Sequence, residues 1–288
     1  MAASTTNSPE LTSEQVQKIL IEPLETASVF LAAGPRIFDT DGSPVRVPSL
    51  ASMGAPAWHG ENEQITEVDA GFGEIALLPS TIKSLKSLTR FSNELARQSV
   101  VSLDSALQAR MVKDVANKLD AAFIAGDGTV VSGSRTTPLG LLNYTGAQTV
   151  DAAPTALDPI VDAWGLLLGA GANVTAAKWL MNPADFVALR KIKQGTGSNG
   201  YVLTPDPTAD GVFRLFGAEV KVSTHVPAGS AILADFSQVA VARDSAPSVK
   251  ILDQTFGDYD QMAIRVTARY DAAPLNPEAV VIVKAEED

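Results

Sequence analysis

The chain of 288 residues contains no cysteine, which excludes disulfides, thiolate nucleophiles and cysteine-ligated metal centres. It has only two histidines, His59 and His225, so a histidine-rich metal site is excluded and a Ser-His-Asp site would depend on one of them. No apolar run approaches the roughly eighteen residues of a membrane-spanning helix, and residues 1–10 lack the pattern of a secretory signal. We therefore expect a protein with no membrane contact, made and kept in the cytosol.

Positive charge is also scarce. The 22 lysines and arginines face 33 aspartates and glutamates, which leaves a net charge of −11. That balance opposes binding to a phosphate backbone, so we expect no sequence-specific binding of nucleic acid. The 45% hydrophobic and 19% charged fractions are typical of a folded protein with a sizeable core.

The scarcity of positive charge is sharpest in residues 47–82, which contain no lysine or arginine. Five carboxylates lie in this segment: Glu61, Glu63, Glu67, Asp69 and Glu74. Few large apolar side chains accompany them, and the segment reads as a long two-stranded hairpin with little to bury. Because an isolated hairpin is marginally stable in water, we expect it to lie on another surface.

A basic stretch follows directly and carries Lys83, Lys86, Arg90 and Arg97. Opposite charge on identical copies makes a neighbouring subunit the natural partner of the acidic hairpin. Trp58 and Phe72 are the expected apolar anchors of that contact, because aromatic side chains dominate the energetics of interfaces. The sequence therefore predicts a protein that assembles with itself.

A long helix is predicted between Ser102 and Gly126. Apolar residues recur there every four positions, at Leu103, Leu107, Met111, Val115, Leu119 and Phe123. Six turns span roughly 35 Å, so this helix should be the spine of the protein. Before it, a helix is expected to open at Thr12 or Ser13 and to end near Ala27, and Asp41-Gly42 is a hairpin-turn signal.

Elements of both kinds alternate irregularly after the spine. Helices are predicted at 157–168 and from Pro183 through Arg190 and Lys193. Apolar, β-branched runs predict strands at 178–181, 218–223, 231–233, 239–243, 249–252, 262–270 and 279–285. This order is typical of an α+β fold and not of a regular βαβ repeat.

The motifs that could carry chemistry lack their structural context. Residues 195–200 match G-x-G-x-x-G, but a helix is predicted before them where nucleotide binding needs a strand, so we interpret them as a surface loop. Ser80 and Lys83 match S-x-x-K without the two companion motifs of penicillin-recognising enzymes. The acidic cluster lacks the loop spacing of calcium sites. We expect no cofactor, no metal and no catalytic site; a hydrolase using Ser80 or Ser92 is the remote alternative.

Several segments, taken in order, resemble the major capsid proteins of tailed bacteriophages with the Hong Kong 97 fold. The similarity spans roughly residues 28 to 285. The segments that carry it are Trp58-x-Gly60-Glu61, Phe72-Gly-Glu-Ile-Ala-Leu-Leu-Pro79, Ser92-Asn-Glu-Leu95, Phe123-Ile-Ala-Gly126-Asp-Gly128, Pro138-Leu-Gly-Leu-Leu142, Trp179-Leu-Met-Asn182-Pro183, Leu215-Phe-Gly217, Val226-Pro-Ala-Gly229, Arg243-Asp244, Arg269-Tyr-Asp271 and Pro277-Glu-Ala279.

This resemblance implies a Hong Kong 97-like fold with four parts. They are an N-terminal arm (1–43), an extended loop formed by the acidic hairpin (44–82), a peripheral domain with the spine helix (83–150 and 255–288) and an axial domain (151–254). It also implies assembly as hexamers and pentamers into an icosahedral shell around double-stranded DNA, with portal, scaffolding and decoration proteins as further partners. The alternative within the same fold is an encapsulin-type bacterial compartment.

Some members of that family join their subunits by an isopeptide bond from a lysine in the extended loop. Here Ile65 lies near that position, and residues 47–82 contain no lysine. We therefore expect no such crosslink, and a ladder of covalent oligomers on denaturing gels of mature particles would contradict this.

Overall fold

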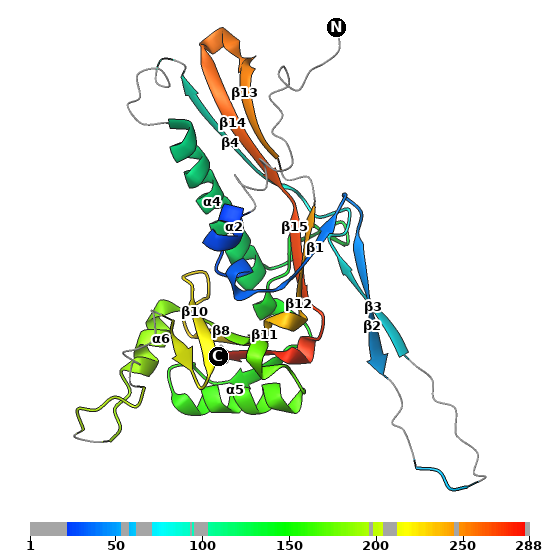
Figure 1. Ribbon diagram of the computed structural model, residues 1–288, viewed down its shortest axis with the longest axis vertical. Helices are drawn as coiled ribbons and strands as arrows, with labels where there is room; N and C mark the ends of the chain where they lie inside the picture. Colours follow the sequence, from blue (N-terminus) through cyan, green and yellow to red (C-terminus); the bar gives the residue numbers. More distant parts are fainter. Residues whose placement is uncertain are drawn as a thin grey trace.

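The computed structural model describes residues 22–52, 58–61, 71–92, 94, 103–195, 198–203, 212–244 and 248–285. Four parts can be followed in Figure 1: a long helix beside an extended three-stranded sheet, a mixed six-stranded sheet with two helices, a small sheet between these two, and a projecting two-stranded hairpin. The expected α+β architecture is confirmed.

The spine helix α4 spans Leu103–Ala125, within one residue of each predicted boundary. One of its faces packs on the sheet formed by β4 (Leu85–Ser92), β14 (Gln261–Ala268) and β13 (Ser248–Phe256), in the order β13-β14-β4 with antiparallel pairing. Val115 and Leu119 of the helix belong to the same buried cluster as Phe91 and Ile264 of the sheet. The other face of this sheet points away from the helix.

The spine ends where two stretches of backbone approach each other closely. A Cβ atom added to Gly140 would lie 2.5 Å from the amide nitrogen of Gly126, so only glycine fits at this position. The Gly140 amide donates to the Gly126 carbonyl at 2.9 Å, and Asn143 donates its side-chain amide to the same carbonyl. These contacts fix the loop after α4, which contains the short strands β5 (Val130–Val131) and β6 (Ser134–Arg135) and the turn η3 (Leu141–Asn143).

The six-stranded sheet has the order β7-β16-β11-β8-β10-β9 and mixes parallel with antiparallel pairs. Helices α5 (Leu157–Gly169) and α6 (Pro183–Arg190) pack on one of its faces through a cluster that includes Trp164, Phe186 and Trp179. Its strands are β7 (Gln148–Asp151), β8 (Ala177–Met181), β9 (Arg214–Leu215), β10 (Ala218–Val222), β11 (Ser230–Asp235) and β16 (Val280–Lys284).

A three-stranded sheet, β1-β12-β15, joins the two larger parts. Its strands are β1 (Arg36–Thr40), β12 (Val239–Asp244) and β15 (Tyr270–Pro274). The short helix α2 (Glu22–Ala27) and the turn η2 (Leu31–Ala33) precede it and pack on the spine, with Phe30 against the ring of Phe123 at a centroid distance of 5.1 Å. The remaining 3-10 turns are η4 (174–176), which leads from α5 into β8, and η5 to η7 (236–238, 257–259 and 277–279), which connect strands.

Two predictions about local structure were wrong. The turn at Asp41-Gly42 does not make a hairpin, because β1 pairs in parallel with β12 while the following strand β2 pairs with β3. The single strand predicted over 262–270 is two strands in two different sheets, since β14 ends at Ala268 and β15 begins at Tyr270. In both places pairing with distant strands overrode the local signal. The beginning of the predicted helix at Thr12 or Ser13 lies outside the described residues.

Candidate assembly surfaces

The acidic hairpin consists of β2 (Val45–Ser52) and β3 (Gly71–Leu77), which pair antiparallel from Val45↔Leu77 to Ser52↔Gly71. Near its base, one face is attached to the body, because Val47 and Ile75 pack on a cluster that includes buried Leu77. On the other face Arg46 and Glu74 form an exposed ion pair at 3.4 Å. The described base of the hairpin is therefore anchored in the core of its own chain.

Strands β2 and β3 extend away from both large sheets (Figure 1). The side chain of Trp58 is fully exposed and that of Glu61 is exposed as well. Phe72 lies in β3 opposite Leu50, but only its backbone is described. Glu63, Ile65, Glu67 and Asp69 lie outside the described residues. An exposed tryptophan is costly in water, so this surface is suited to a contact with another molecule.

The part of the basic stretch that contains Lys86 and Arg90 is strand β4, which was not predicted from the sequence. Lys86, Leu88 and Arg90 alternate with inward-facing residues and point to the side of the sheet away from α4. Arg90 also lies over the ring of Phe256, with its Cζ 4.0 Å from the centroid. Two of the four predicted basic residues therefore share one outward face.

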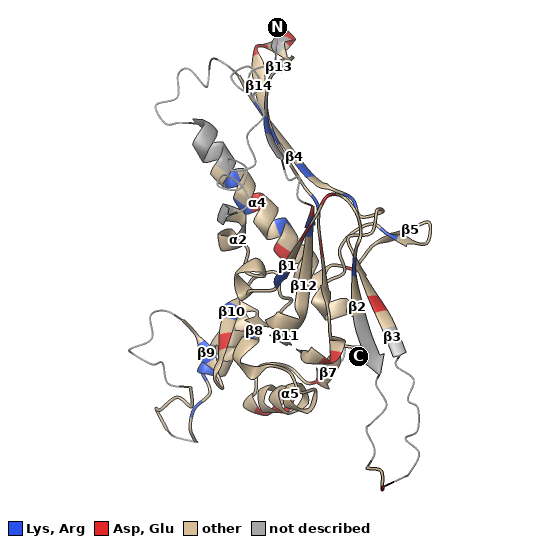
Figure 2. Ribbon diagram, turned by 45° about the vertical axis from the view of Figure 1, so that its right-hand side comes forward, with Lys and Arg blue, Asp and Glu red and all other residues tan. Residues whose placement is uncertain are grey.

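Two further cations, which sequence reasoning missed, share that face. Arg265 of β14 is directly opposite Leu88, and Lys250 of β13 is directly opposite Arg265. Residues directly opposite each other in antiparallel strands point to the same side. We call Lys86, Arg90, Lys250 and Arg265 the basic sheet face; Figure 2 shows blue segments along these strands. The period-two alternation in 262–270 could have predicted the side of the strand on which Arg265 lies. It could not have predicted which residues of β4 and β13 lie beside Arg265.

The other two predicted basic residues are placed differently or not at all. Lys83 is exposed but precedes β4, and its amide donates to the Thr136 carbonyl at 2.9 Å, beside the base of the hairpin. Arg97 lies outside the described residues. The structure thus brings Lys86 and Arg90 together and separates Lys83 from them.

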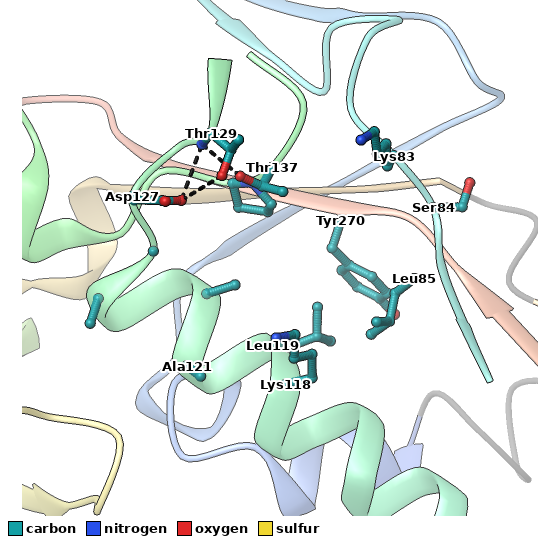
Figure 3. A pocket seen from close by; sticks show the side chains of 14 residues that line it. Lys83, Ser84, Leu85, Lys118, Leu119, Ala121, Asp127, Thr129, Thr137 and Tyr270 are labelled. Carbon is teal, nitrogen blue, oxygen red and sulfur yellow. Dashed lines mark hydrogen bonds between the residues drawn. The ribbon is translucent and has the colours of Figure 1, made fainter. Parts of the chain in front are cut away.

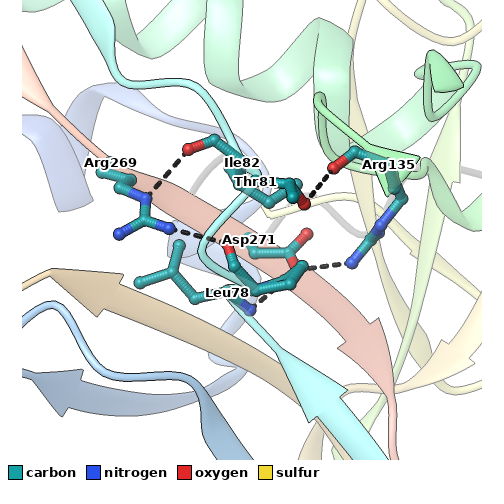
Figure 4. Close-up of polar contacts among 7 residues, drawn as sticks. Leu78, Thr81, Ile82, Arg135, Arg269 and Asp271 are labelled. Carbon is teal, nitrogen blue, oxygen red and sulfur yellow. Dashed lines mark hydrogen bonds and ion pairs between the residues drawn. The ribbon is translucent and has the colours of Figure 1, made fainter. Parts of the chain in front are cut away.

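Two residues of one short segment, Arg269 and Asp271, hold the base of the hairpin to the body (Figure 4). Asp271 Oδ2 accepts from the Leu78 amide at 2.9 Å and from Arg135 Nη2 at 2.6 Å, and its side chain is fully buried. Arg269 donates to the carbonyls of Pro79 and Ile82 at 2.6 and 3.0 Å. Charge-assisted bonds of this kind are strong where water is excluded.

Two features of this junction are unfavourable by themselves: the burial of the Asp271 carboxyl and the backbone conformation of Leu78. Burial raises the pKa of the Asp271 carboxyl above its ordinary value of 3.8, although the Arg135 guanidinium and the Leu78 amide act in the opposite direction. Leu78 has a φ of +53° and is fully buried. A left-handed conformation costs a non-glycine residue on the order of 1 kcal/mol, so the surrounding contacts must impose it. The junction therefore fixes the direction in which the hairpin leaves the body.

A pocket of about 550 Å³ lies beside this junction, between the end of α4 and the start of β4 (Figure 3). Leu85, Leu119 and Tyr270 line it, and Lys83 and Lys118 stand at its sides. The polar groups on its far wall bond to one another: the Thr129 amide donates to Asp127 Oδ1 and to Thr137 Oγ1. No group of acidic or histidine side chains able to hold a metal ion occurs within the described residues.

Within the part of the chain that the structure describes, none of the motifs considered for catalysis forms a site. Ser80 lies in an exposed turn and Ser92 ends strand β4, whereas His59 is on the hairpin and His225 follows β10 in the six-stranded sheet. The G-x-G-x-x-G segment follows helix α6 instead of a strand, and only part of it is described. None of the described helices is long and apolar enough to cross a membrane.

Comparison with known proteins gives consistent results. The family described as "Phage capsid family" matches residues 11–285. The chain is 22% identical over 303 residues to the major capsid protein of Klebsiella oxytoca phage phiKO2, which covers 94% of this chain and 67% of that protein.

Solved capsid structures share the fold over most of the chain. The capsid of a native GTA particle has a TM-score of 0.69 at 19% identity and covers 100% of this chain and 95% of its own. A structure from Mycobacterium phage Adephagia has a TM-score of 0.69 at 17% identity, with 91% of each chain covered. The expected Hong Kong 97-like capsid fold is confirmed.

Proposed function

Because this chain belongs to the phage capsid family and is a major capsid protein that forms the shell of a phage virion, we propose that the shell is icosahedral, built of hexamers and pentamers, and encloses double-stranded DNA. Its role is structural and not enzymatic. One observation supports the proposal above all: the same chain carries both a projecting acidic hairpin and an outward-facing basic sheet face.

We propose that the acidic hairpin of one subunit lies on the basic sheet face of a neighbour. On that face Lys250 and Arg265 are directly opposite each other, so two positive side chains of neighbouring strands lie on the same outward side of the sheet as Lys86 and Arg90. The hairpin supplies Glu61, Glu63, Glu67 and Asp69 within nine residues and has no lysine or arginine beyond Arg46. Exposed Trp58, together with Phe72, supplies the apolar anchor.

The energy of each contact is small, but the shell repeats it. A single exposed ion pair contributes about 0–1 kcal/mol, so one hairpin with four acids gains only a few kcal/mol from charge. In a closed symmetric assembly every subunit makes and receives the same contact. Modest terms of this size are therefore sufficient to decide whether subunits assemble.

The proposed division of the chain follows the resemblance, with one change. We propose the same four parts: an N-terminal arm (1–43), an extended loop (44–82), a peripheral domain (83–150 and 255–288) and an axial domain (151–254). Strands β7 and β16 pair within the six-stranded sheet of the axial part, so we assign residues 148–151 and 280–284 to it.

The proposal also covers partners other than the chain itself. Portal and scaffolding proteins, and decoration proteins where present, would complete the particle. The net charge of −11 lets enclosed DNA move along the inner wall without sticking to it. A salt-sensitive affinity of free subunits for DNA would count against this part.

Electron microscopy of the purified protein, alone and with the products of neighbouring genes, tests the proposal. Closed shells or rings of five and six subunits are expected. A uniform monomer or dimer under all assembly conditions would contradict it. Shells that co-purify with a cargo enzyme instead of DNA would indicate the compartment alternative.

A further inference from the structure

The exposed face of α5 combines apolar and acidic side chains. Asp158, Val161, Asp162 and Leu168 recur at helical spacing and are all exposed, while Trp164 and its neighbours face the sheet. More than half of Val161 and of Leu168 is exposed, at 51% and 56%. Neither aspartate forms an ion pair within the described part of the chain. We call these four residues the α5 face.

The α5 face also allows close approach. Gly165 and Gly169 lie on it, and a Cβ atom added to either would stand in open space. Glycine weakens the interior of a helix, and no described residue of this subunit packs close enough to explain Gly165; Gly169 is the last residue of α5. A second molecule that packs on the helix would bring its side chains nearer to the backbone at these two places.

A second exposed patch, at α6 and β9, combines apolar and basic side chains. Val187, Arg190 and Lys191 are three and four positions apart and share one side of α6. The ring of Phe213 packs at a tilt of 52° against buried Phe186, with the ring centroids 5.0 Å apart, and Arg190 Cζ lies 5.5 Å from the Phe213 centroid. Arg214 continues the patch on β9 and is exposed.

We call Val187, Arg190, Lys191, Phe213 and Arg214 the α6–β9 patch. Val187 is 47% exposed and Phe213 is 44% exposed. Lys191 and Arg214 form no ion pair in the described residues. The α5 face and the α6–β9 patch lie over different strands of the sheet: α5 contacts β7 and β16, whereas β9 forms the opposite edge (Figures 1 and 2).

We infer that the α6–β9 patch of one subunit docks on the α5 face of the next and that this contact closes the ring of subunits. The occupant of each surface is thus a second copy of this chain. Both surfaces pair exposed aliphatic or aromatic groups with charge, and the charges are opposite. Because the two surfaces differ, the contact is head-to-tail, the type that generates rings. The inference rests on the proposed function, since it specifies which faces meet within a ring.

Charge reversal on each surface tests the inference. Variant A carries Asp158→Lys and Asp162→Lys, and variant B carries Lys191→Glu and Arg214→Glu. Each alone should need at least about tenfold more subunit to form rings, because like charges then meet at every contact. The variant with all four substitutions should form rings as the wild type does. It has the wild-type net charge, which controls for charge in general.

A mixture of A and B gives the sharpest readout. Reversed surfaces then complement each other only between unlike subunits, so native mass spectrometry should find even-numbered rings with equal amounts of A and B. Unfolding temperatures of the isolated variants establish that each still folds. Normal ring formation by A and B alone, or no rescue in the mixture and in the fourfold variant, would overturn the inference. Failure of the wild-type chain to form rings or shells would count against the proposed function instead.

Discussion

Arg135 and Asp271 are 136 positions apart in the chain and form an ion pair at 2.6 Å, with the carboxylate fully buried. The same carboxylate oxygen accepts the amide of Leu78, the residue with which the hairpin strand β3 enters the body. The direction of the assembly element is therefore fixed by a contact made between the loop after the spine and strand β15.

Removal of this carboxylate should destabilise the subunit strongly. Asp271→Ala leaves Arg135 without its partner and the buried Leu78 amide without an acceptor, for which we expect a loss of about 2–4 kcal/mol in the free energy of unfolding. Urea unfolding of the soluble subunit measures it. The matched control is Asp39→Ala, which removes an ion pair of the same length, 2.6 Å, to Arg243, but whose carboxylate is 56% exposed. The control should lose about 1 kcal/mol or less. Equal losses would show that burial of Asp271 has no energetic consequence.

Asp271 also predicts a dependence of stability on pH. Its pKa is raised in the folded state, so its contribution to stability is greatest below 3.8 and decreases as the pH rises through the folded-state pKa. Asp271→Asn cannot ionise. The free energy of unfolding of the wild type minus that of this variant should therefore fall as the pH rises from below 3.8 to neutral. Urea unfolding across this range provides the measurement, and a difference that rises with pH would show that ion pairing with Arg135 outweighs burial.

The attachment of the N-terminal segment to the spine depends on Ser28. Its hydroxyl donates to Asp120 Oδ1 at 2.5 Å and accepts from the Leu31 amide, and both Ser28 and Asp120 are buried. Ser28→Ala should cost about 1–2 kcal/mol, because it leaves a buried carboxylate oxygen and a buried amide short of a partner.

Hydrogen exchange at the Leu31 amide, together with thermal unfolding, should detect the effect of Ser28→Ala. Thr175→Ala is the control, since the Thr175 hydroxyl donates to the Asn173 side chain at an exposed site. We expect the control to change stability by less than about 0.5 kcal/mol. A Ser28 variant with unchanged exchange at Leu31 would contradict the assigned role.

Reversal of the basic sheet face should impair assembly more than folding. Lys86→Glu combined with Arg265→Glu turns a face that attracts the acidic hairpin into one that repels it, so the subunit concentration needed for shells should rise at least about tenfold. Light scattering measures assembly, and circular dichroism verifies the fold. Lys113→Glu on the exposed side of α4 is a control that should assemble near the wild-type concentration. A double variant that assembles normally would remove the basis for the hairpin contact.

The sequence predicted the spine helix and the hairpin because each has a signal contained in a short segment. Apolar residues every four positions delimited α4, and the absence of lysine and arginine in 47–82 identified the hairpin. The basic sheet face was predicted only in part. Arg265 is brought near Lys86 because β14 pairs with β4, a strand more than 150 residues away in the chain, and Lys250 follows through its pairing with Arg265. No local sequence pattern specifies the register of that long-range pairing.

The junction at Asp271 and the anchor at Ser28 were not predicted, for the same physical reason. Each consists of a polar group that is buried only because a distant segment supplies its partner, Arg135 for Asp271 and Asp120 for Ser28. The wrong expectation at Asp41-Gly42 has the converse origin. Its turn chemistry is correct, since Gly42 has a φ of +81°, but parallel pairing of β1 with β12 separates the two flanking strands.

A reconstruction of the assembled shell by electron cryomicroscopy tests the central claim most directly. The acidic hairpin of one subunit, with Trp58 and Glu61, should lie across the basic sheet face of a neighbour, within ion-pair distance of Lys86, Arg90, Lys250 or Arg265. A shell in which the hairpin contacts only its own subunit, or in which that sheet face remains uncovered by any hairpin, would contradict it.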